Sequence, residues 1–307
     1  MSDLPDTIAA DVRAVLDGLG PAPTGAPTAA ASRQRLIDET PAMWPHPEPV
    51  DEIADVLVPS PDGGVPARRY RAGATDGPVV VFFHGGGWMS GDLDTHDGLC
   101  RAIAVRAGAT VLAVDYRRTP EHRFPAALDD AIAATRWLAA ETGRAPIVMG
   151  DSSGATLALG VALAARRAAA QQPAGIVLIY PPLEPRTDSP SHVRFADGPR
   201  LTQAAMAWFW REYLGAQDTD DELAAPARAS DLRGLPPTLI ALADHDPLHD
   251  EGADFARRLA AAGVEVETIA PAGMVHGFAR LQETAGAQLV LDAVAAATRR
   301  WTAERAG

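Results

Sequence analysis

The chain has 307 residues, of which 47% are hydrophobic and 22% are charged, and its formal net charge is −13. This composition is that of a folded globular protein and excludes a mostly disordered chain. A strongly acidic surface repels phosphate backbones and anionic lipid headgroups, so nucleic acids and membrane surfaces are poor partner candidates. The single cysteine, Cys100, excludes an intrachain disulfide and a cysteine-based metal cluster.

The first residues are acidic and are not followed by an apolar segment, which argues against a secretory signal. The sequence also has no run of 18 apolar residues, so no membrane span is expected. Together these features predict a cytoplasmic protein.

Residues 1–20 predict a short amphipathic helix, because apolar residues recur at helical spacing between Ile8 and Leu19. Residues 21–31 are rich in proline, alanine, glycine and threonine and predict a loop. A second short helix is expected at about residues 33–39.

From residue 51 onward, short apolar runs alternate with helical segments. Asp62-Gly63, between the first two runs, is a typical hairpin turn. The predicted strands are residues 52–58, 65–71, 79–83, 110–115, 147–150, 175–180, 238–243 and 264–269. The predicted helices include residues 126–141, 155–170, 251–262 and 287–303. Runs of valine, isoleucine and leucine indicate strands buried on both faces, and their alternation with helices predicts a doubly wound, parallel α/β sheet.

This alternation is interrupted once, between Tyr180 and Thr238, where nearly sixty residues contain no predicted strand. The interval holds a loop at residues 181–199 and then an aromatic helix. Long insertions of this kind often form lids over functional sites. Together with the N-terminal helices, the insertion predicts a helical cap.

The strongest local motif is Gly150-Asp151-Ser152-Ser153-Gly154, which follows a buried strand and opens an alanine-rich helix. A G-x-S-x-G nucleophile elbow requires this strand–turn–helix context, because the tight turn lifts the serine hydroxyl out of the sheet. The helix N-terminus behind it favours negative charge. Ser152 is therefore the candidate nucleophile.

A second motif, His84-Gly85-Gly86-Gly87-Trp88, directly follows a buried strand. Its glycines let backbone N–H groups point at an oxygen anion, which side chains would otherwise block. It lacks the lysine and the spacing of a phosphate-binding loop. We expect the N–H groups of Gly85, Gly86 and Ser153 to form an oxyanion hole, with His84 bracing the loop.

A serine nucleophile needs a base, and the base needs an orienting acid. His276 is favoured as the base because it lies just past the last strand among small residues, whereas His192 lies in the polar insertion and is expected to be solvated. Asp244 and Asp246 both follow a strand and are equal candidates for the acid by position. His245 and His249 are four residues apart, but Pro247 interrupts the helix that metal ligation would need, so no metal site is expected.

In four blocks the sequence resembles the hormone-sensitive-lipase family of α/β hydrolases, in its bacterial carboxylesterase branch. The blocks are residues 84–88, residues 115–126, the elbow, and the pair formed by residues 246–252 and 273–278. The family's acid aligns with the aspartate that precedes Pro-Leu, so the resemblance implies Asp246 as the acid and His276 as the base.

The resemblance implies an α/β-hydrolase fold with a mostly parallel eight-stranded sheet, flanking helices and a small helical cap. Residues 1–45 would form the N-terminal part of the cap, and residues 46–307 the catalytic domain with a cap insertion at about 183–225. Trp88, Trp208 and Phe209 are candidate walls of the substrate pocket. A homodimer is plausible on the resemblance alone.

The implied activity is that of a serine carboxylesterase, which hydrolyses esters with short to medium acyl chains through an acyl-enzyme and needs no cofactor. The same residues would suit an amidase, a formamidase or a lactonase. A remote alternative is a non-catalytic small-molecule receptor like the plant gibberellin receptors, which resemble this family. Those receptors lose the catalytic histidine, whereas His276 is present in its full motif.

Overall fold

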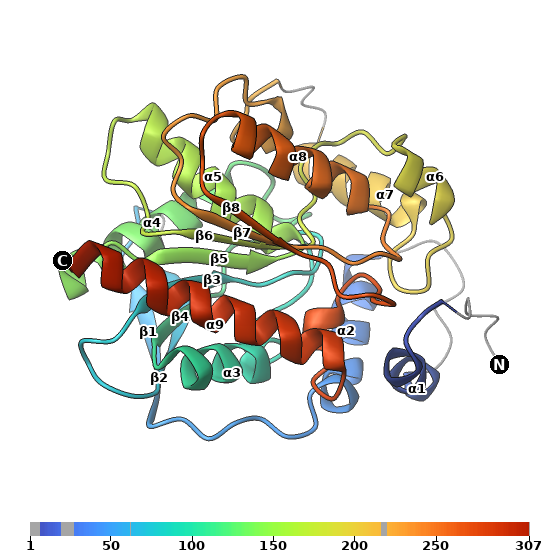
Figure 1. The fold of residues 1–307 in the computed structure, drawn as a ribbon, viewed down its shortest axis with the longest axis horizontal. Coiled ribbons are helices and arrows are strands. Elements are labelled where there is room, and N and C mark those ends of the chain that lie inside the picture. Colours follow the sequence, from blue (N-terminus) through green and yellow to red (C-terminus); the bar gives the residue numbers. More distant parts are fainter. Residues whose placement is uncertain (1–6, 20–27, 62, 216–219, 307) are drawn as a thin grey trace.

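The computed structural model describes residues 7–19, 28–61, 63–215 and 220–306. Its described part is built on one eight-stranded sheet in the order β1-β2-β4-β3-β5-β6-β7-β8 (Figure 1). The two pairs β1–β2 and β2–β4 are antiparallel, and the other five pairs are parallel. The predicted mostly parallel sheet is confirmed. The strands are β1 (Glu52–Val58), β2 (Val65–Arg71), β3 (Val79–Phe83), β4 (Thr110–Val114), β5 (Ile147–Asp151), β6 (Ile176–Ile179), β7 (Thr238–Ala241) and β8 (Val266–Ile269).

The first three strands begin and end at the predicted residues. β1 and β2 pair in a hairpin whose register places Val58 opposite Val65. Asp62, in the turn of that hairpin, lies outside the described residues. Local patterning therefore located these strands to the residue, because a strand of alternating or continuous apolar residues has few other ways to bury them.

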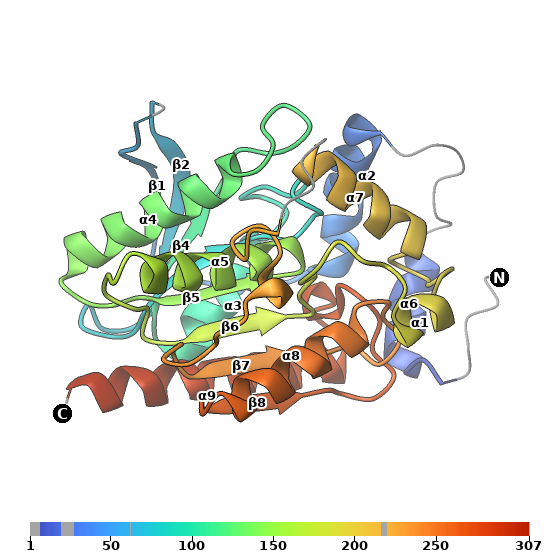
Figure 2. The same ribbon diagram turned by 90° about the horizontal axis from the view of Figure 1, so that it is seen from above.

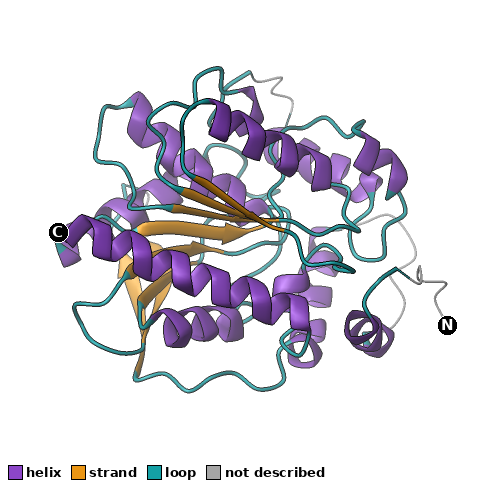
Figure 3. Ribbon diagram, in the orientation of Figure 1, coloured by secondary structure: helices purple, strands orange, loops and turns teal. Residues whose placement is uncertain are grey.

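The sheet lies between two helical layers (Figures 1 and 3). Helices α4 (Ala126–Thr142), α5 (Ser153–Arg167) and α8 (His249–Ala261) share a hydrophobic core with one face of the sheet, and α3 (Asp97–Ala107) and α9 (Ala285–Ala306) share a core with the other. Successive side chains of β3 enter opposite cores, as the pleat of a strand dictates. In the described part of the chain, no helix is both long and apolar enough to cross a bilayer.

Helices α1 (Ala10–Gly18), α2 (Ala29–Met43), α6 (Pro190–Arg194) and α7 (Gln203–Leu214) lie beyond one end of the sheet (Figure 2). α2 is longer than predicted at both ends; it begins at Ala29, where the Thr28 hydroxyl caps it by accepting the N–H of Ala31, and it continues to Met43. Residues 20–27 of the predicted N-terminal loop lie outside the described residues. α6 was not predicted; it begins with a capping serine, Ser189, followed by proline at the first helical position.

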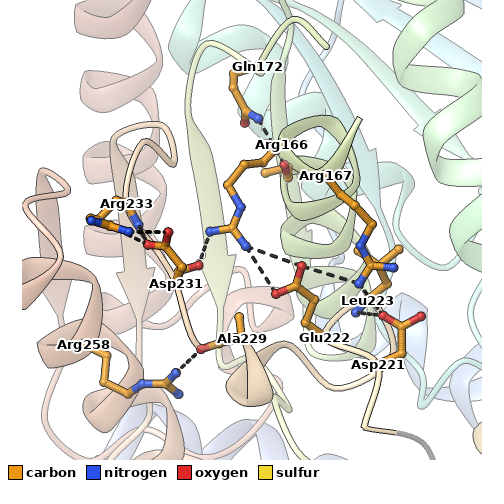
Figure 4. A network of polar contacts seen from close by, with 11 residues as sticks. Arg166, Arg167, Gln172, Asp221, Glu222, Leu223, Ala229, Asp231, Arg233 and Arg258 are labelled. Atoms are coloured by element: carbon orange, nitrogen blue, oxygen red, sulfur yellow. Dashed lines mark hydrogen bonds and ion pairs between the residues drawn. The ribbon is translucent and has the colours of Figure 1, made fainter. Parts of the chain in front are cut away.

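Ion pairs fasten the end of the long insertion to the helical layer (Figure 4). At the C-terminus of α5, Arg167 Nη2 lies 2.6 Å from Asp221 Oδ1, and Arg166 Nη2 lies 3.2 Å from Glu222 Oε2. A few residues after Glu222, the backbone carbonyls of Ala227 and Ala229 accept hydrogen bonds from the guanidinium of Arg258 in α8. The chain that returns to β7 is therefore held against both α5 and α8.

Candidate active site

The G-x-S-x-G motif forms a strained turn. β5 and α5 leave Ser152 alone between them, with φ 50° and ψ −125°, a conformation that few non-glycine residues adopt. A Cβ atom on Gly150 would lie 2.2 Å from the backbone of Gly154, and one on Gly154 would lie 1.9 Å from the carbonyl oxygen of Phe83. Glycine is thus required at both flanking positions, because the helix and the two strands approach too closely for any side chain.

Three residues from distant parts of the sequence meet at this turn. Ser152 Oγ lies 2.9 Å from His276 Nε2, and His276 Nδ1 lies 2.7 Å from Asp246 Oδ2. The other carboxylate oxygen of Asp246 accepts the N–H of Leu248 at 2.9 Å. With Asp246 accepting a hydrogen bond from Nδ1–H, the ring presents an unprotonated Nε2 to the serine hydroxyl. This arrangement can withdraw a proton from the hydroxyl.

The two candidate acids have different partners. Asp246 is buried and faces the imidazole, whereas Asp244 Oδ2 accepts the N–H of Gly273 at 2.8 Å. Gly273 lies in the loop after β8 that carries His276, three residues before it. Asp244 therefore secures the loop, and Asp246 contacts the ring.

Backbone N–H groups beside the serine are arranged differently from the expectation. The N–H of Gly85 donates to Asp151 Oδ1 at 2.8 Å. The prediction that Gly85 serves an oxyanion is therefore wrong, because a buried carboxylate already occupies its donor. Among the described residues, the N–H groups of Gly86, Gly87 and Ser153 have no protein acceptor. Gly86 and Gly87 have φ values of 122° and 63°, which glycine adopts without strain.

Asp151 organises the buried side of the turn. Besides the N–H of Gly85, it accepts the Tyr180 hydroxyl at 3.3 Å, and His96 Nε2 lies 3.4 Å from its Oδ1. Burial alone would raise the pKa of Asp151, but His96, Arg280 and the hydrogen bond from the N–H of Gly85 lower it below its ordinary value. The carboxylate next to the nucleophile is thus ionised and holds the glycine loop in place.

His84 braces the same loop, as expected. Its ring stacks on Tyr116 with centroids 4.2 Å apart, and its carbonyl accepts the Tyr116 hydroxyl at 2.7 Å. Burial, followed by the proximity of His96, lowers the pKa of His84 to about 3. The ring is therefore neutral in the folded protein under all but strongly acidic conditions.

We expect acid to destabilise the protein through this histidine. The unfolded chain takes up a proton near pH 6.5, whereas folded His84 remains neutral down to about pH 3. The stabilisation is fully present above pH 6.5 and is lost as the pH falls, by roughly 1.4 kcal/mol per pH unit. Urea titrations between pH 7 and pH 4 measure this slope.

The substitution His84→Phe, which keeps a ring on Tyr116, should make that slope shallower by about one proton. Burial also lowers the pKa of His96, so His96 contributes to the pH dependence of stability in both the unaltered protein and the variant. An identical slope in the variant would show that His84 is not the group responsible.

Only one of the three aromatic residues expected on the pocket wall lies there. Phe209 lines the cavity at Ser152, whereas Trp88 and Trp208 do not. Trp88 is fully buried and stacks on Tyr213, with centroids 4.2 Å apart and planes 10° apart. Its ring belongs to the aromatic core formed with α7, because burial of so large an apolar surface outweighs exposure in a cavity. The ring of Trp208 packs beside that of Phe209, with centroids 5.0 Å apart.

Ser152 opens into a cavity of about 170 Å³. One part of its wall is apolar and consists of Leu36, Met43, Leu201, Met206 and Phe209. Another part is charged and consists of Arg35, Glu39, Arg200 and Arg280. Sequence reasoning missed the charged residues, although Arg280 carried a signal as the only charge in the run Phe278-Ala279-Arg280-Leu281.

The remaining histidines do not form a metal site. His192 is buried rather than solvated, because its neighbour Ser191 is hydrogen-bonded to the start of α8. The Ser191 hydroxyl donates to the carbonyl of Pro247 and accepts the N–H of Asp250, and the Ser191 N–H donates to the Asp250 carboxylate. His249 Nδ1 lies 2.8 Å from the carbonyl oxygen of Ala243, and His245 packs against Phe195. The described residues contain no group of three or more ligands that could hold a metal ion.

A serine on a strained strand–helix turn, hydrogen-bonded to a histidine–aspartate pair at the end of a mostly parallel sheet, defines an α/β hydrolase. A family model described as alpha/beta hydrolase fold matches residues 80–280. The chain belongs to the hormone-sensitive-lipase family of α/β hydrolases, as its motifs predicted.

Its relatives include esterases. Esterase LipI of Mycobacterium tuberculosis is 43% identical over 261 residues, which cover 81% of this chain and 80% of that protein. The ethyl acetate hydrolase of Pseudomonas putida is 38% identical over 245 residues, covering 75% and 77%. The structure is similar to that of a hyperthermophilic esterase from the archaeon Pyrobaculum calidifontis, with a TM-score of 0.90 and 33% identity over 95% of this chain and 98% of that one.

Proposed function

We propose that the protein is a serine carboxylesterase that hydrolyses esters with short to medium acyl chains. The observation that carries this proposal is the hydrogen-bonded series Ser152–His276–Asp246 at the elbow. Its relatives named esterases support the same reaction.

In the proposed mechanism, Ser152 Oγ attacks the ester carbonyl carbon while His276 Nε2 takes the hydroxyl proton. The negative charge that develops on the carbonyl oxygen is stabilised by the N–H groups of Gly86, Gly87 and Ser153. The intermediate then expels the alcohol, which takes the proton from His276. A water molecule then attacks the acyl-enzyme carbonyl carbon while His276 takes its proton. His276 returns that proton to Ser152 Oγ as the carboxylic acid is released.

The size of the cavity supports the proposed chain length. Its volume of about 170 Å³ is below the roughly 300–1,000 Å³ typical of sites for drug-sized ligands. The apolar part of its wall suits a short alkyl group. Longer chains would have to extend out of the cavity, and we expect rates to fall with them.

We also propose that residues 1–45 and about 183–225 form a cap on a catalytic domain of residues 46–307. Residues of α2 and α7 that line the cavity support this division. A homodimer through the exposed edge of β8, and a cytoplasmic location, are further proposals. Light scattering and cell fractionation test them.

The decisive experiment combines kinetics with labelling. We expect turnover of p-nitrophenyl esters, fastest for short acyl groups, and a loss of about 10⁴-fold or more in Ser152→Ala. A phosphonate should label the unaltered protein once, at Ser152. Faster turnover of p-nitroanilides, formamides or lactones would assign one of those activities instead, and labelling elsewhere would contradict the proposed nucleophile.

A further inference from the structure

The charged part of the cavity wall joins three elements. α2 contributes Arg35 and Glu39, the segment before α7 contributes Arg200, and η2 (Phe278–Arg280) contributes Arg280. Glu39 forms two ion pairs, from Oε1 to Arg35 Nε at 2.6 Å and from Oε2 to Arg200 Nη2 at 2.9 Å. A single carboxylate thus serves two guanidinium groups.

Arg280 has no such partner. Its side chain is buried, and Nη2 donates to Thr40 Oγ1 and to the carbonyl of Thr95, both at 2.9 Å. Both acceptors are neutral, and among the described residues no carboxylate oxygen lies within 4.0 Å of this guanidinium. Burial lowers the pKa of Arg280, and it outweighs the charges of Asp151 and Glu39, which raise this pKa; the positive charge of Arg200 lowers it further.

The other carboxylate of the cavity, Asp151, is already engaged. It accepts the N–H of Gly85 and the hydroxyl of Tyr180, and it lies 3.4 Å from His96. Three guanidinium groups therefore share the wall with two carboxylates, one of which is committed to the glycine loop. A partly buried positive charge without a full partner is costly, and an anion bound in the cavity would offset that cost.

We propose, building on the carboxylesterase function, that the preferred substrates are esters bearing a second, free carboxylate, such as half-esters of short dicarboxylic acids. Arg200 and Arg280 hold that carboxylate while Ser152 attacks the ester carbonyl. Guanidinium groups suit this task, because their planar N–H donors match the two oxygens of a carboxylate. Hydrolysis then gives a free dicarboxylic acid and an alcohol.

A pair of matched esters tests this proposal. Monoethyl succinate and ethyl 4-methylpentanoate have the same length, with a carboxylate in one replaced by an isopropyl group in the other. We expect kcat/KM to favour the anionic ester by about 10-fold or more, the size expected of charge-assisted hydrogen bonds. Arg200→Met should reduce this preference by about 10-fold, and Arg200→Lys should retain part of it.

Arg136→Met is the matched control, because it removes the same charge from an exposed position on α4 and should leave the preference unchanged. Arg280→Met should reduce the preference as Arg200→Met does. Because Arg280 also joins η2 to α2, the Arg280 variant could fail to fold, and the Arg200 variants then test the proposal alone. Calorimetry on Ser152→Ala should detect binding of monoethyl succinate that the added Arg200→Met weakens.

The experiment distinguishes failure of this substrate preference from failure of the carboxylesterase proposal. Hydrolysis of the neutral ester with equal or slower hydrolysis of the anionic one, or a preference that Arg200→Met does not reduce, overturns this inference but leaves the carboxylesterase proposal intact. Failure to hydrolyse any ester, together with no phosphonate label on Ser152, overturns the carboxylesterase proposal itself.

Discussion

Replacement of Asp246 by asparagine is expected to lower kcat by about 10⁴-fold while changing KM little. The carboxylate lies 2.7 Å from His276 Nδ1 and is almost completely buried. An amide that donates its N–H to Nδ1 would favour the tautomer with the proton on Nε2, which cannot accept the proton of Ser152. The neutral amide of asparagine also cannot stabilise the imidazolium that forms during attack. Steady-state kinetics with a short p-nitrophenyl ester measure the loss.

Asp244→Asn is the matched control, since it makes the same change two residues away. The carboxylate of Asp244 accepts the N–H of Gly273, and asparagine retains an oxygen that can do so. We expect less than about a tenfold loss in kcat. If the two variants lost activity equally, the assignment of the acid to Asp246 would fail.

Much of the architecture follows from patterns within short stretches of sequence. The strand that ends at Phe83 and the hairpin before it were located to the residue, because their apolar patterns and turn residues are local. The elbow was also predictable, since steric crowding at Gly150 and Gly154 leaves a fixed sequence signature. Ser152 and His276 could be favoured from local patterns alone, whereas the choice of Asp246 over Asp244 came only from the resemblance to the family.

What the sequence could not give depends on contacts between distant segments. Whether Gly85 or its neighbours offer a free N–H depends on where the Asp151 carboxylate points. The burial of His192 depends on the packing of α6 against α8, which no periodicity within a five-residue helix reveals. Similarly, Glu39 reaches the cavity only because α2 docks there, held by Arg33, whose guanidinium binds both carboxylate oxygens of Glu121.

Gly154→Ala should damage stability and catalysis together. The added Cβ would lie 1.9 Å from the carbonyl oxygen of Phe83 and 2.7 Å from that of His84. Both are backbone atoms that lead into the glycine loop, so relief of the clash must displace that loop from Ser152. We expect unfolding free energy to fall by about 3 kcal/mol, at the upper end of overpacking costs. Loss of one aligned oxyanion donor should lower kcat by about 10²–10³-fold.

Gly160→Ala makes the same substitution in the same helix and separates this effect from helix propensity. Its Cβ would meet the end of the Leu128 side chain at 2.8 Å, which can rotate away. Alanine is favoured over glycine within a helix by about 1 kcal/mol, so stability should change by no more than that amount and activity should persist. Urea denaturation and ester kinetics on both variants provide the comparison. Full activity in Gly154→Ala would mean that the glycine loop is not positioned by its contact with the elbow, because the clash would then have been absorbed without moving the donors.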